Sequence, residues 1–199
     1  MVRHDAAALV APAQAVVRPP AAPAVAEADA TNAAASCLTT SYAIVAGLFD
    51  AGALPGQTSL VQSPTLQGAA GSSLQMGSKT VTMTSVGQAQ ALDAVFTNPK
   101  FPQCYQQYVT ALATAAVPGA TALVQPVTLT GPAGVQTHGV VTTYTLPGAA
   151  TEVVGSAFII GGRVVTVLQP STNGSAIPGD VFTPAFNAVA GRVAAAAGK

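Results

Sequence analysis

The stretch VVGSAFIIGGRVVTVL, residues 153–168, decides the fold. Two runs rich in valine, isoleucine and phenylalanine, Val153–Ile160 and Val164–Leu168, flank Gly161-Gly162-Arg163. β-branched and aromatic residues favour strands, and a glycine-rich connection of this length is typical of a tight β-hairpin. The second half of the chain is therefore predicted to be built around an antiparallel strand pair.

Further strand patterns lie on the N-terminal side of this hairpin. Val135–Leu146 alternates polar and apolar residues, which indicates a half-buried strand. Thr121–Thr130 is predicted to be an edge or bulged strand, because Pro126 cannot donate a hydrogen bond to a ladder. Thr58–Leu66 and Leu74–Val86 are two more predicted strands, so the sheet has five to six strands.

Helical spacing of apolar residues marks the remaining segments. An opening helix capped by Ser36 extends to Phe49, a helical patch ends at Pro99, and a longer helix starts at Pro102. The closing helix covers Phe182–Val193. The predicted order is helix, two strands, two helices, four strands, helix. This order indicates an α+β fold, an antiparallel sheet covered by amphipathic helices.

The two cysteines of the chain are Cys37 and Cys104. Each falls in the first turn of a predicted helix, so a disulfide between them would join two helix starts. In a threonine-rich, lysine-poor chain, two cysteines favour a disulfide and an oxidising compartment. The alternative is two unrelated buried thiols, because spacing along the sequence does not by itself establish pairing.

The N-terminal segment, residues 1–34, is rich in alanine, proline and valine and shows no periodicity. Such composition favours a disordered or extended tail, which leaves residues 35–199 as one α+β domain. The tail is interpreted as a linker, and the alternative is that Ala7–Val17 docks on a partner subunit.

Charge is scarce and balanced, with seven basic and seven acidic residues in 199. A nucleic-acid interface or an anionic membrane surface needs clustered cations, which this chain does not have. No run of about 20 apolar residues occurs, so no transmembrane helix is predicted. A charge-poor surface repels its own copies weakly. Self-association or binding to a permanent partner is therefore the expected kind of partnership.

No motif for catalysis, a cofactor or a metal is present. The segment GSSLQMGSKT, residues 71–80, lacks the glycine-to-lysine spacing of a phosphate-binding loop and is interpreted as the entry to a strand. A serine triad would have to use His138, which is interpreted as a half-buried structural histidine. Two histidines and a paired set of cysteines leave too few zinc ligands. The prediction is a protein that is not an enzyme and has no cofactor.

Four side chains are candidates to line an apolar cleft near the disulfide: Tyr105, Tyr108, His138 and Tyr144. The alternative for Tyr108 in particular is ordinary packing in the core.

Three features together resemble a known group of proteins: the sequence Phe101-Pro102-Gln103-Cys104-Tyr105, the hairpin Val153–Leu168 and the closing helix Phe182–Val193. They resemble secreted actinobacterial lipoprotein-like domains with a Mog1/PsbP-like fold, which are also similar to the extracellular sensor domains of some mycobacterial Ser/Thr kinases. This resemblance implies a non-enzymatic binding or accessory module of the cell envelope. It transfers no functional residue.

The expected function is accordingly that of an extracytoplasmic binding or accessory module, secreted or associated with the cell envelope. Its ligand would be an apolar molecule or another envelope protein. The alternative is a structural subunit of a larger assembly, which would use the charge-poor surface and the N-terminal tail for contacts.

Overall fold

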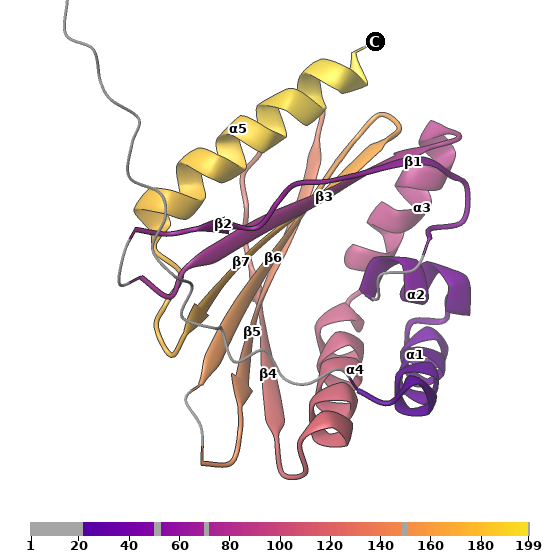
Figure 1. Ribbon diagram of the computed structural model, residues 1–199. Coiled ribbons are helices and arrows are strands. Elements are labelled where there is room, and N and C mark those ends of the chain that lie inside the picture. The colour runs from indigo at the N-terminus through magenta and orange to yellow at the C-terminus, as the bar shows by residue number, and fades with distance from the viewer. Residues whose placement is uncertain (1–21, 50–52, 70–71, 149–150, 199) are drawn as a thin grey trace, which may run out of the picture.

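The computed structural model describes residues 22–49, 53–69, 72–148 and 151–198. These residues form five helices and a seven-stranded antiparallel sheet, which confirms the α+β class (Figure 1). The predicted count of five to six strands is too low, because the predicted strand Thr58–Leu66 is divided into two strands, Gln57–Gln62 and Leu66–Gln67. The elements in chain order are α1 (Ala24–Leu38), α2 (Tyr42–Phe49), β1 (Gln57–Gln62), β2 (Leu66–Gln67), β3 (Gln75–Met83), α3 (Val86–Phe96), α4 (Phe101–Ala116), β4 (Thr121–Val127), β5 (Gln136–Thr145), β6 (Glu152–Gly161), β7 (Val164–Asn173) and α5 (Gly179–Ala197).

The sheet has the strand order β1-β3-β7-β6-β5-β4, and the short β2 pairs with β3 on the same side as β1. The predicted hairpin is β6–β7, in which Gly161 pairs with Val164 across the turn Gly162-Arg163. Gly162 has a φ of 54°, which glycine adopts without steric cost at the first position of a tight turn. Strands β4 to β7 form a meander that returns β7 to the side of β3.

The sheet is covered on both faces, by α1 to α4 on one and by α5 on the other (Figure 1). Neighbouring residues of β6 point to opposite faces. Phe158 and Ile160 therefore lie in the larger core, under the first four helices, while Ala157 and Ile159 lie in the core under α5. Because both faces of β6 are buried, its sequence is almost continuously apolar, and the prediction from residues 153–168 rested on that property.

The beginning of the chain differs from the prediction. The predicted tail, residues 1–34, is wrong from Ala24 onward, because helix α1 begins there; residues 1–21 lie outside the described residues. The predicted opening helix is two helices, since Thr39 ends α1 in the left-handed conformation with a φ of 54°. No single described helix is long and apolar enough to cross a membrane, although α1 and α2 together, bent by 116°, meet that criterion by length and composition.

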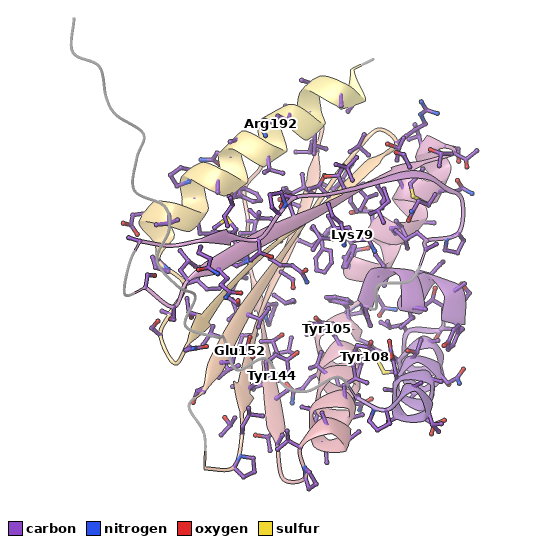
Figure 2. The ribbon with its side chains drawn as sticks, in the orientation of Figure 1. Lys79, Tyr105, Tyr108, Tyr144, Glu152 and Arg192 are labelled. Carbon is purple, nitrogen blue, oxygen red and sulfur yellow. A yellow bond between two sulfur atoms is a disulfide. The ribbon has the colours of Figure 1, made fainter. Side chains whose placement is uncertain are left out.

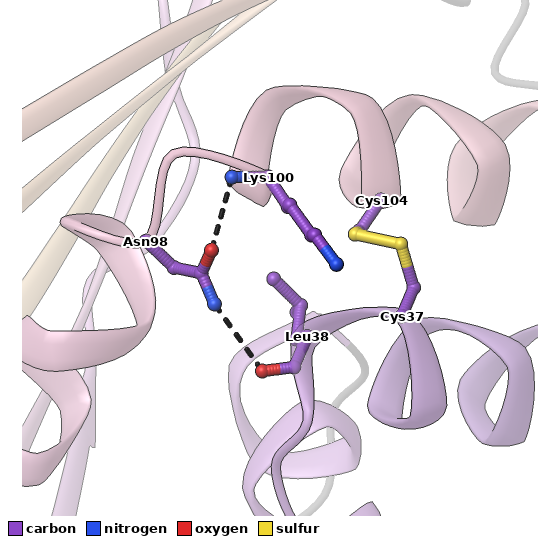
Figure 3. Close-up of a disulfide and its surroundings, with 5 residues drawn as sticks. All are labelled: Cys37, Leu38, Asn98, Lys100 and Cys104. Carbon is purple, nitrogen blue, oxygen red and sulfur yellow. Dashed lines mark hydrogen bonds between the residues drawn. A yellow bond between two sulfur atoms is a disulfide. The ribbon is translucent and has the colours of Figure 1, made fainter.

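The disulfide between Cys37 and Cys104 is confirmed, with Cα atoms 5.8 Å apart (Figure 3). Cys37 lies in the last turn of α1 and not, as predicted, in the first turn of a helix, because the helix begins earlier than expected. The bond therefore joins the end of α1 to the start of α4. Asn98 supports the same junction, since its Nδ2 donates to the carbonyl of Leu38 and its Oδ1 accepts from the backbone N–H of Lys100.

Helix α4 also closes one edge of the sheet. Its Gln106 side chain accepts a hydrogen bond from the backbone N–H of Val124 in the edge strand β4, at 3.1 Å. Its Thr110 hydroxyl donates to the carbonyl of Ala122, at 3.4 Å. The strand order confirms that β4 is an edge strand, and its Pro126 has no N–H to donate. Two outward-facing backbone groups of β4 are thus hydrogen-bonded to α4, and a third position has no N–H.

Two helical glycines are expected to respond in opposite ways to alanine. A Cβ on Gly47 in α2 would lie 2.9 Å from the Cα of Leu54. Gly47→Ala would therefore push the backbone of α2 away from that of Leu54, and it should lower the free energy of unfolding by about 1–3 kcal/mol. A Cβ on Gly191 in α5 meets nothing within 4 Å. Gly191→Ala should therefore raise the free energy of unfolding by roughly 0.5–1 kcal/mol, through helix propensity alone. Urea denaturation of both variants measures the difference, and a stabilised Gly47→Ala would contradict the tight α2 packing.

Candidate functional site

Strand β3 changes character along the face that α1 to α4 cover. Its residues on that face are Gln75, Gly77 and Lys79 at the beginning of the strand, followed by the apolar Val81 and Met83. Val81 and Met83 are buried in the larger core, at 3% and 1% exposed. The first three are only half-buried. The helices therefore cover one end of this strand and leave the other end open.

Strand β7 shows the same change in register with β3. Val165 pairs with Val81 and is 1% exposed. Farther along, Gln169 pairs with Gly77, and Ser171 pairs with Gln75. Two neighbouring strands thus present a shared polar surface beside a shared apolar one.

A groove of about 640 Å³ lies over this surface, within the range of about 300–1,000 Å³ that is usual for small-molecule sites. Its lining comes from α2, from the segment after it and from strands β1, β3 and β7. The lining residues are Gly47, Leu48, Phe49, Leu54, Gln62, Ser63, Thr65, Gln75, Met76, Gly77, Ser78, Lys79, Val81, Val165, Val167, Gln169 and Ser171.

The lining combines an apolar base with uncharged hydrogen-bonding groups. Val81, Val165 and Leu54 supply the buried apolar part. The polar part consists of glutamine, serine and threonine side chains that can both donate and accept. Among the described residues that line the groove, Lys79 has the only charged side chain (Figure 2). The groove is therefore suited to an uncharged molecule that has both apolar and hydrogen-bonding parts.

Two of the four predicted cleft residues lie directly behind the groove wall. The ring of Phe49, which lines the groove, packs on Tyr105 at 4.8 Å and on Tyr108 at 5.0 Å between centroids. Tyr108 is 3% exposed, so core packing is its main role. Burial raises the pKa of the Tyr105 phenol, while hydrogen bonds with Ser156 and Thr142 act in the opposite direction. The two tyrosines support the wall and are not themselves lining residues.

The other two predicted cleft residues lie elsewhere on the same face of the sheet. His138 in β5 stacks on Phe96, and its Nε2 lies 2.6 Å from Asp93 Oδ1 in α3. Its side chain is 21% exposed. Tyr144, also in β5, is half-buried and packs against the larger core. Neither residue lines the groove, so the groove does not bring the four candidates together.

Glu152 is a residue whose position the sequence did not reveal. It is a carboxylate at the start of a strand, a position that is usually exposed, but it is 4% exposed. It pairs across the sheet with Tyr144 on one side and with Asn173 on the other (Figure 2). Glu152 is therefore a buried carboxylate within the sheet.

The described residues include no group of three or more histidine, cysteine, aspartate or glutamate side chains that could hold a metal ion. No protein-family model matches the chain, and no curated protein matches it. The case for a function therefore depends on the geometry of the groove.

Proposed function

We propose that the chain is a non-enzymatic, extracytoplasmic binding module of the cell envelope, and that its ligand lies in the groove beside α2. The observation that carries the proposal is the groove itself, a space of about 640 Å³ with an apolar base and a polar rim in which Lys79 is the one charged side chain among the described lining residues. Sites for small molecules combine these two features, because apolar surface supplies affinity and a few polar groups fix orientation.

The chemistry of the lining argues for an uncharged amphipathic ligand. An apolar part of the ligand would cover Val167 and the ring of Phe49, which are only partly buried without it. Hydroxyl or amide groups of the ligand would reach Gln62, Gln75 and Gln169 around the rim. This refines the expectation of an apolar ligand, since a purely apolar molecule would leave these amides without partners.

The location is supported by the Cys37–Cys104 disulfide, because such bonds persist mainly in oxidising compartments. The resemblance to secreted envelope domains with a Mog1/PsbP-like fold agrees with this location and with a binding role. The alternative role, as a structural subunit, requires an interaction surface.

Gly77 offers a direct way to fill the groove. It lies in β3 among the lining residues, and a Cβ added to it meets nothing within 4 Å. A phenylalanine at this position should occupy the groove without disturbing the sheet, since aromatic residues suit strands. We expect Gly77→Phe to bind the uncharged dye Nile red about tenfold more weakly than the wild type does, by fluorescence titration.

The matched control is Gly191→Phe in α5, another glycine at which an added Cβ meets nothing within 4 Å but which lies outside the groove. It should bind Nile red as the wild type does. Equal binding by wild type and Gly77→Phe would show that the dye enters some other site, and it would contradict the proposal if both variants keep wild-type thermal stability.

A further inference from the structure

The two edges of the sheet are treated differently. At the β4 edge, Gln106 accepts from the outward-facing N–H of Val124, Thr110 donates to the carbonyl of Ala122, and Pro126 has no N–H. At the opposite edge, β1 pairs with β3 on its inner side, and no other described strand pairs with its outer side. Open strand edges attract further strands, so natural proteins usually protect them.

The register shows which groups of β1 are open. Just beyond β1, the backbone N–H of Ser63 donates to the carbonyl of Ser78 in β3. Because antiparallel residues alternate in the direction of their backbone groups, Val61 also faces β3. The N–H and carbonyl groups of Leu60 and Gln62 therefore point away from the sheet, toward a strand that could be added.

The side chains of β1 do not deter such pairing. Val61 is 66% exposed and Leu60 is 45% exposed, although both are apolar. The strand QTSLVQ contains no proline and no charged residue, so it lacks the usual protection against strand addition.

We propose that β1 pairs antiparallel with β1 of a second copy of this chain, so that two sheets become one continuous sheet. In this arrangement Leu60 exchanges two backbone hydrogen bonds with the partner's Gln62, and Gln62 does the same with the partner's Leu60. Val61 then lies directly opposite the partner's Val61 at the two-fold axis. The two valines form a non-hydrogen-bonded pair, the kind of antiparallel pair in which the side chains come closest.

The absence of charge along β1 favours a second copy of this chain as its partner. In a two-fold contact every residue near the axis meets its own kind, so any charged residue there meets a like charge. No charged residue occurs between residues 53 and 69. The nearest charge on this part of the sheet is Lys79, one strand inward and opposite Gln62. Self-pairing of β1 therefore carries no direct electrostatic penalty.

The pairing also places the two grooves on the same side of the joined sheet. Gln62, Ser63 and Thr65 line the groove at this edge.

A strand pair of this length buries less than the roughly 1,200 Å² of a stable interface, so the dimer should be weak and dependent on protein concentration.

The test is sedimentation velocity over a range of concentrations, with Val61→Lys and the matched control Leu123→Lys. Leu123 lies on the guarded edge strand β4 and is 52% exposed, so the two substitutions are alike in chemistry and exposure. Wild type and Leu123→Lys should form dimers as concentration rises, whereas Val61→Lys should stay monomeric. A monomeric wild type, or loss of the dimer in both variants, would overturn the proposal.

Amide hydrogen exchange distinguishes strand pairing from any other dimer. The amides of Leu60 and Gln62 should exchange more slowly as the dimer forms, while the amide of Val61, already bonded to β3, should change little. A dimer without this slowing at Leu60 and Gln62 would also overturn the proposal. Neither outcome depends on the ligand of the groove, so this test and the Nile red test fail independently.

Discussion

Replacing both Cys37 and Cys104 by alanine should lower the free energy of unfolding by about 4 kcal/mol relative to the wild type. The cysteines are separated by 67 residues, and closing a loop of that length restricts the unfolded chain by about 4 kcal/mol in the entropy model. Cys104 is also fully buried, so its replacement removes packing contacts as well. Because domains are stable by only about 5–15 kcal/mol, this loss is a large share of the total.

Guanidinium denaturation with and without a reducing agent measures this effect in the wild-type chain itself. Reduction should lower the unfolding midpoint of the wild type, while the double alanine variant should show the same midpoint under both conditions. An unchanged midpoint on reduction of the wild type would mean that the bond does not stabilise the fold by restricting the unfolded chain.

The second large effect is expected at the centre of the larger core. Phe158 in β6 is 3% exposed, and its ring lies 4.1 Å from that of Phe96 between centroids. Phe96 in turn packs on Phe101 at 5.2 Å. Phe158→Ala would open a cavity that links the sheet to α3 and α4. We expect the free energy of unfolding to fall by about 3–5 kcal/mol.

Phe182→Ala is the matched control for this substitution, because Phe182 is only half-buried, in the smaller core under α5, where it stacks on Phe186 at 5.9 Å. Phe182→Ala should lower the free energy of unfolding clearly less than Phe158→Ala does, as measured by urea denaturation under the same conditions. Equal losses in the two variants would contradict the assignment of the main core to the face under α1 to α4.

The strands and the later helices could be predicted because their buried and exposed positions carry residues of clearly different polarity. Val81 and Met83 alternate with threonines, and the structure buries both of them. Pro126 marked an edge strand because a missing N–H is visible in the sequence. The residues of β6 are apolar on both faces because both faces are covered.

Helix α1 was missed because its buried face is made largely of alanine. Ala30, Ala34 and Leu38 recur at helical spacing and are buried, and α1 packs on α4. Alanine differs little from its neighbours in this alanine-rich segment, so the pattern gives a weak signal. The left-handed Thr39 that separates α1 from α2 is a threonine in a conformation that threonine rarely adopts, and no residue preference predicts it.

The groove was missed because it depends on which strands are neighbours. β3 and β7 are separated by two helices and three strands in the chain, and their pairing was not predicted. A signal was nevertheless present in β3. On one face the residues change from Gln75 and Lys79 to Val81 and Met83, which indicates that the covering layer reaches only half of the strand.

The central claim is that the groove beside α2 holds an uncharged amphipathic ligand. Native mass spectrometry of protein isolated gently from the cells that make it, with Gly77→Phe isolated in parallel, tests this claim most directly. The account predicts a wild-type species heavier than the chain by the mass of a small molecule, and no such species for Gly77→Phe. Wild-type protein that carries no added mass, or an added mass that Gly77→Phe retains in full, would contradict it.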